Sequence, residues 1–136
     1  MQFETKIAVV LRADLAVWQK TNVTAFLVSG IAGTVPGVVG EPYRDGSGNE
    51  YLPMFVQPVL VYEAEGEALR RAYERAMSRG VRPAIYTREL FATNHDEANR
   101  AAVATVAARD LDLVGIAFRA ERKTVDKIVD RLRFHP

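Results

Sequence analysis

Four side chains with acid–base or hydrogen-bonding chemistry lie close together near position 90. Glu89 supplies a carboxylate, Thr93 a hydroxyl, Asn94 an amide and His95 an imidazole. They follow the strand-like segment 81–87, and open α/β sheets bind ligands beyond the ends of their strands. The spacing therefore predicts a site at this strand exit.

The same segment also fits a structural role. Asn94 and Glu97 have the spacing of a capping box, in which two side chains satisfy the free N–H groups at a helix start. Thr93 or Asn94 would then cap a helix expected over 96–107. Capping does not exclude function, so both interpretations stay open.

Lys20 is the second candidate for chemistry, because it lies early in an otherwise apolar helix. One alternative is that its amine simply extends to solvent. The other is that it points at the cleft bordered by Glu89, where a lysine and a carboxylate can polarise a carbonyl or position a water. We predict Lys20, Glu89 and Thr93 as catalytic residues of one cleft, with Asn22, Arg88, Asn94 and His95 as binding residues at its margin.

Other kinds of site are disfavoured by composition. The 136 residues include no cysteine and two histidines, which excludes disulfides, thiol catalysis and thiolate metal sites. Neither histidine has a second ligand at helical spacing, so we expect no metal. No phosphate-binding loop or nucleophile elbow is visible, and no cofactor is expected. His135 is expected to be frayed.

Charge and hydropathy limit the expected partners. The net charge is +1, whereas strong non-specific nucleic-acid binding needs a dense basic surface. We therefore expect weak or no binding to nucleic acid. No signal peptide or membrane-spanning run is visible, so we expect a cytoplasmic protein without a membrane partner. A small-molecule ligand is the partner that the predicted cleft suggests.

Apolar strand-like runs alternate with amphipathic helical patterns along the chain. The expected strands are 6–12, 58–63, 81–87 and 111–119, and the expected helices are 14–31, 67–79, 96–107 and 122–132. Continuous β-branched runs are typical of strands that are covered on both faces. The order predicts one domain, a three-layer α/β/α sandwich around a small four-stranded sheet.

Residues 33–57 interrupt this alternation with a segment rich in glycine and proline. Segments 41–44 and 50–53 flank the turn-forming residues 45–49, which predicts a β-hairpin or a folded surface loop. The segment also carries many apolar residues that need a cover: Val35, Val38, Val39, Tyr43, Tyr51, Leu52, Met54 and Phe55. We expect a homodimer to provide it; the alternative is a small core within the segment.

The first third of the chain resembles type II peptidyl-tRNA hydrolases. Segment 6–15 reads as that family's opening hydrophobic strand followed by an arginine, a small residue and Asp-Leu. Gln19 and Lys20 match its Gly-Lys position with the lysine kept. The family's histidine, seven residues after the lysine, falls on Leu27 instead.

The later segments are similar in the same order. Segment 88–94 resembles the family's Arg-Asp-Ala-Gly-Arg-Thr-Gln motif, with Arg88 and Thr93 retained. Segments 112–118 and 124–128 resemble its last strand and its Val-Asp-Lys helix. The chain is closer still to a bacterial family of unknown function within this hydrolase-like superfamily, in its segments 18–26 and 89–99. The resemblance implies a mixed four-stranded sheet with helices on both faces, and no established activity.

The missing histidine limits what the resemblance implies about function. Loss of a positioned acid–base group lowers a rate by roughly 10²–10⁴-fold, so peptidyl-tRNA hydrolysis is not expected unless His95 substitutes for it. Two hypotheses follow. The first is a divergent hydrolase that uses Lys20, Glu89 and Thr93, and the second is a non-catalytic small-molecule-binding or regulatory module that uses the same cleft.

Overall fold

The structure is a computed structural model that describes residues 2–136. Its strands are β1 (Thr5–Arg12), β2 (Tyr43–Arg44), β3 (Glu50–Tyr51), β4 (Val59–Ala64), β5 (Ala84–Thr87), β6 (Leu113–Glu121) and β7 (Arg133–Phe134). Its α-helices are α1 (Val17–Thr34), α2 (Gly66–Ser78), α3 (Asp96–Ala104) and α4 (Arg122–Ile128), with 3-10 helices η1 (Arg88–Phe91) and η2 (Ala108–Asp110).

Five of these strands form one mixed sheet in the order β5-β6-β1-β4-β7. β1 runs parallel to β4 and antiparallel to β6, while β5 and β7 run antiparallel to their neighbours. The prediction of a mixed α/β fold is confirmed, but the prediction of four strands is wrong. The fifth strand, β7, pairs Phe134 with Tyr62 and Arg133 with Glu63 of β4. It is only two residues long, too short to produce an apolar run that the sequence would reveal.

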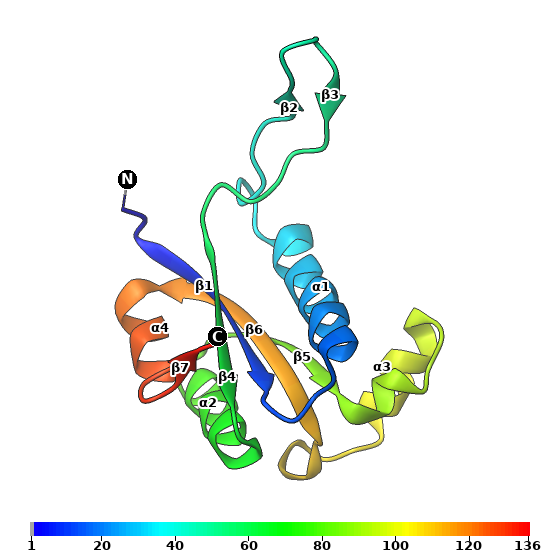
Figure 1. Cartoon of the computed structure of the whole chain (residues 1–136). Helices are drawn as coiled ribbons and strands as arrows, with labels where there is room; N and C mark the ends of the chain where they lie inside the picture. Colours follow the sequence, from blue (N-terminus) through cyan, green and yellow to red (C-terminus); the bar gives the residue numbers. More distant parts are fainter. Residues whose placement is uncertain (1) are drawn as a thin grey trace.

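Helices cover both faces of the sheet, with α1 on one face and α2 and α4 on the other (Figure 1). Alternate residues of β1 point to opposite faces, as the strand geometry requires. Ile7 and Val9 pack in the cluster beneath α1, whereas Ala8 and Val10 pack in the cluster beneath α2 and α4. Burial on both faces explains the unbroken apolar run of this strand.

Gly115 allows α1 to lie close to β6. A Cβ atom at this position would lie 2.7 Å from Val23 Cγ1, closer than real Cβ atoms approach, and 3.1 Å from Leu27 Cδ1, which is tighter than most real contacts. Leu27, where the resembled hydrolases carry a histidine, is 2% exposed and packs in this contact. An apolar residue at that position therefore serves the core.

Several element boundaries differ from those predicted. α1 begins at Val17 because Asp14 pairs with the guanidinium of Arg12, and the N–H of Ala16 is satisfied by the side chain of Gln19 at 2.9 Å. β5 begins after Pro83, which has no N–H to donate. α3 and α4 end earlier than their apolar patterns predicted.

A β2–β3 hairpin projects from the body of the molecule (Figure 1). We call residues 39–56 the arm. Tyr43 pairs with Tyr51 and Arg44 with Glu50, but every residue from 41 to 52 is exposed. At the base of the segment 33–57, by contrast, Val38 is buried and Val35 and Phe55 pack beside it in the cluster beneath α1. Part of the segment is therefore covered by the core of the body, and its tip is not.

The base of the arm is held by Gln57. Its side chain is buried, donates to Thr5 O at 3.0 Å and accepts from Arg119 Nε at 3.2 Å. The arm thus has a fixed root and an uncovered tip. In the part of the chain that the structure describes, no helix has the length and apolarity to cross a membrane.

Candidate functional site

A cleft of about 420 Å³ lies between α1, β5, η1 and the start of α3. We call it the aromatic cleft. It is lined by Trp18, Asn22, Phe26, Tyr86, Leu90, Phe91, Thr93, Asn94, His95, Asp96 and Asn99.

Three residues of α1 form one wall of the aromatic cleft. Trp18, Asn22 and Phe26 follow one another at intervals of four, so they lie along a single face of the helix. The facing wall comes from β5 and from η1, which directly follows that strand. The predicted location of a site at this strand exit therefore coincides with a cleft.

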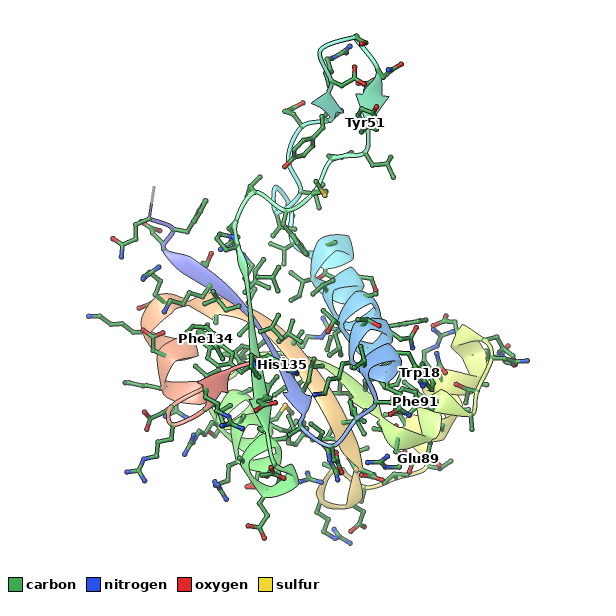
Figure 2. All side chains as sticks on the ribbon, viewed as in Figure 1. Trp18, Tyr51, Glu89, Phe91, Phe134 and His135 are labelled. Carbon is green, nitrogen blue, oxygen red and sulfur yellow. The ribbon has the colours of Figure 1, made fainter. Side chains whose placement is uncertain are left out.

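The aromatic rings contact one another in a chain. The Trp18 and Phe91 centroids lie 5.8 Å apart in an edge-to-face arrangement, Phe91 and Tyr86 lie 5.1 Å apart, and Tyr86 and Phe26 lie 6.0 Å apart. Figure 2 shows Trp18 and Phe91 side by side where α1 meets η1. Trp18 is nevertheless 62% exposed and Phe26 54% exposed, so large apolar faces border the cleft.

Tyr86 forms the floor of the aromatic cleft. Its hydroxyl accepts from Asn22 Nδ2 at 3.4 Å and donates to Leu90 O at 3.5 Å. Burial raises the pKa of Tyr86, and the hydrogen bond from Asn22 opposes that rise only in part. The hydroxyl therefore stays protonated at neutral pH and remains a hydrogen-bonding group.

Polar groups surround the aromatic floor. Thr93 Oγ1 lies 3.0 Å from Leu90 O and contacts Asn99 Oδ1, so its hydroxyl is bound to carbonyl oxygens. Among residues 2–136, Asn99 Nδ2 and the side-chain amide of Asn94 have no hydrogen-bond partner. These groups are available to a ligand.

His95, rather than Thr93 or Asn94, caps α3. Its Nδ1 accepts a hydrogen bond from the N–H of Ala98 at 3.1 Å. An imidazole that accepts at Nδ1 carries its proton on Nε2 when neutral. His95 therefore combines the capping role with an N–H donor beside the cleft. The interpretation that Thr93 or Asn94 caps this helix is wrong.

Arg88 and Glu89 lie outside the lining of the aromatic cleft. Arg88 Nε is 3.2 Å from Asp112 Oδ2, in a network that also includes Arg12 and Asp14. The Glu89 side chain is exposed, and Figure 2 shows it on the far side of Phe91, well apart from His135. Both residues follow β5, but η1 turns their side chains away from the cleft.

Lys20 lies on the opposite flank of α1. Its Nζ is 3.0 Å from His135 Nε2, and His135 Nε2 is 3.8 Å from the buried carboxylate of Glu63. Arg133 pairs with the same carboxylate at 2.6 Å. We call these four residues the tail cluster. Lys20, Glu89 and Thr93 are thus not brought together.

His135 is held in place rather than frayed. Its backbone N–H donates to Val61 O at 2.9 Å, and Nδ1 is 3.0 Å from Pro136 O. Nδ1 therefore carries the proton of the neutral ring, and Nε2 accepts from the Lys20 ammonium group. The sequence did not indicate that Glu63 and His135 lie close together, because their proximity depends on the pairing of the short strand β7 with β4.

The described residues offer no grouping of three side chains of the types that hold metals. What the aromatic cleft presents is ring faces, amides and one imidazole N–H. Groups of these kinds can stack on and hydrogen-bond to a small molecule. In the tail cluster, the Glu63 carboxylate is paired with Arg133, and the Lys20 ammonium group is bound by His135.

A family described as a protein of unknown function, DUF2000, matches residues 5–136. A solved structure of a protein of unknown function from Agrobacterium tumefaciens is 49% identical to the chain with a TM-score of 0.96. The match covers 99% of this chain and 100% of that one. No curated protein matches the chain significantly. The chain belongs to the DUF2000 family.

Proposed function

We propose that the protein binds a small, planar, uncharged molecule in the aromatic cleft. The observation that carries this proposal is the chain of rings from Trp18 through Phe91 and Tyr86 to Phe26 around a volume of about 420 Å³. Exposed ring faces favour a flat, apolar partner that stacks on them.

The polar groups of the cleft define the chemistry of the edge of this ligand. Asn94 and Asn99 Nδ2 lie free at the rim, and His95 offers an N–H. A heteroaromatic ring with adjacent donors and acceptors satisfies both the ring faces and the amides. Asp96 is part of the lining but is already paired with Arg100. No lysine or arginine of the described residues lines the cleft, so the lining offers no cationic side chain to hold a negatively charged ligand.

Binding rather than hydrolysis is the activity that the positions of the reactive groups support. Hydrolysis by Lys20, Glu89 and Thr93 requires one shared cleft, whereas Lys20 Nζ contacts His135 across the other flank of α1. Thr93 Oγ1 contacts only carbonyl oxygens, so no base activates it as a nucleophile. The relation to type II peptidyl-tRNA hydrolases stays a prediction.

The single tryptophan of the chain makes the proposal directly measurable. Trp18 borders the cleft, so a stacked ring is expected to quench its fluorescence in a saturable way. The probes are adenosine as a neutral heteroaromatic compound, adenosine monophosphate as its anionic counterpart, and ribose as a compound without a ring system to stack. We expect quenching by adenosine, weaker quenching by the phosphate ester and none by ribose.

A variant pair assigns the effect to the cleft. Phe26→Ala removes a half-exposed ring from the cleft, and Tyr43→Ala removes a similarly exposed ring from the arm. The first change is expected to weaken adenosine binding about tenfold, the equivalent of ~1.4 kcal/mol, and the second to leave it unchanged. Equal quenching by adenosine and ribose, or equal loss in both variants, would refute the proposal.

A further inference from the structure

The tip of the arm has no hydrophobic core. Residues 41–52 are all exposed, and the paired strands β2 and β3 are two residues each. A two-stranded hairpin on its own is at best marginally stable in water. Its turn is nevertheless well built, since Asp45 accepts hydrogen bonds from Ser47 N, Asn49 N and the Tyr51 hydroxyl. The arm is therefore a preformed element that lacks a covering surface.

The arm presents large apolar side chains to solvent. Tyr43 and Tyr51 are cross-strand partners on one face and are each about half exposed. Leu52 is 85% exposed and Met54 is 58% exposed. Since an aromatic side chain buries 150–250 Å², these four residues offer on the order of 500 Å² per arm.

The body of the molecule has a surface that suits such an arm. Two hollows, of about 230 and 360 Å³, share Arg82 and Pro83 and flank the start of the edge strand β5. Ile31 and Val35 line the first hollow, and Met77 lines the second. We call the two hollows and the residues between them the edge strip.

The arm and the edge strip also differ in charge. Glu41, Asp45 and Glu50 outnumber Arg44 in the arm, so residues 35–57 carry a net charge of −2. The whole chain carries +1, which leaves +3 for the remainder. Arg82 lies between the hollows, and Arg119 lines one of them. An acidic apolar arm therefore complements a basic apolar strip.

A second copy of the chain is the partner that the area favours. One arm on an unlike partner buries on the order of 1,000 Å² in total, which is below the usual size of a stable interface. In a two-fold dimer each copy supplies both an arm and a strip. The buried area then doubles to roughly 2,000 Å², within the range of stable dimers.

We infer that the protein is a two-fold dimer in which the arm of each copy lies on the edge strip of the other. This inference is independent of the proposed ligand. The arm has no core to lose, so a charged residue at its tip leaves the body folded. The arm and the edge strip can therefore each be tested by a single substitution.

Three single variants test the exchange by sedimentation velocity over micromolar concentrations. Leu52→Asp alters the arm and Met77→Asp alters the strip, whereas Val17→Asp changes a residue that is 78% exposed on α1 and belongs to neither surface. We expect dimers for the wild type and Val17→Asp, and monomers for the other two. Circular dichroism melting checks that all four remain folded.

Mixing the two defective variants gives the sharpest test. In the mixed pair, the intact arm of Met77→Asp meets the intact strip of Leu52→Asp, so one of the two contacts is restored. We expect the mixture to dimerise at least tenfold more tightly than either variant alone. A monomeric wild type, a dimeric Leu52→Asp or Met77→Asp variant, or a mixture that stays as monomeric as its components would overturn the inference.

Discussion

The two flanks of α1 have opposite properties although one helix supplies both. On the side of β5, Trp18 and Phe26 border an open cleft without a lysine or arginine in its lining. On the side of β4, Lys20 is engaged by His135 beside the Glu63 carboxylate. The charged side chain of Lys20 is thus bound within the molecule, whereas the neutral aromatic side chains remain accessible.

Helix geometry explains why this difference was hard to foresee. Lys20 and Asn22 are two residues apart, which on an α-helix corresponds to a rotation of about 200°. Neighbours in sequence therefore point to opposite flanks. A lysine that is close to a site in the sequence belongs to that site only when it lies on the same face of the helix as the other site residues.

The largest expected effect comes from the contact that fixes α1 and therefore both flanks. Gly115→Ala places a methyl group 2.7 Å from Val23 Cγ1, and overpacking of this kind costs about 1–3 kcal/mol of the free energy of unfolding. Urea unfolding measures the loss. The control is Gly33→Ala, where a Cβ meets nothing within 4 Å. An unchanged midpoint for Gly115→Ala would disprove the tight α1–β6 contact.

A smaller effect is expected when the open flank alone is altered. Tyr86→Phe removes the hydroxyl that accepts from Asn22 and donates to Leu90 O. Both bonds are long, so we expect a loss of about 1 kcal/mol in the free energy of unfolding. Adenosine binding should weaken in parallel, since Asn22 loses its anchor. A variant that keeps full stability and full binding would show that Tyr86 acts only through its ring.

The closed flank is expected to contribute less. Lys20→Met breaks the contact with His135 but keeps the aliphatic stem of the side chain. Partly exposed polar contacts of this type are worth about 0–1 kcal/mol. Adenosine quenching of Trp18 should be unaffected. A clear loss of quenching in Lys20→Met would contradict the separation of the two flanks.

The smallest effect is a dependence on alkaline pH. Burial raises the pKa of Tyr86, so the folded state keeps its proton above pH ~10, where an unfolded tyrosine ionises. The free energy of unfolding therefore has its full value below pH ~10 and declines as the pH rises from there through the pKa of the folded state. Tyr62 shifts in the same direction through burial. Tyr86→Phe should therefore reduce, and not abolish, the decline in urea midpoint above pH 10; an unchanged decline would argue against it.

Apolar runs in the sequence predicted the four longer strands of the sheet because each run is buried on both faces. β7 was not predicted, since Arg133 and Phe134 form a strand only by pairing with β4. The projection of the arm was not predictable either, because the exposure of Tyr43 and Tyr51 depends on the direction in which the chain leaves the body. Local sequence patterns thus predict the four longer strands, whereas the edge strand β7 depends on pairing with a distant segment.

The candidate site was predictable to a similar degree. Thr93, Asn94 and His95 were predicted from their place at one strand exit and Asn22 from its place near Lys20, and all four line the aromatic cleft. The four rings of the cleft were not among the predicted site residues. Their exposure depends on where η1 and the start of α3 lie beside α1, which no local pattern of the sequence indicates. Their roles in binding stay a prediction.

The position of β6 has a consequence for how the chain acquires its fold during synthesis. β6 pairs with both β1 and β5, and its partner β1 is more than a hundred residues earlier in the sequence. Until the ribosome has released residues 113–121, β1 can pair only with β4, and β5 has no neighbour at all. A nascent chain cut before β6 therefore exposes the apolar face that β6 and α1 would share. Folding should begin only when the last quarter of the chain has emerged, and the slow closure of this long loop should limit its rate.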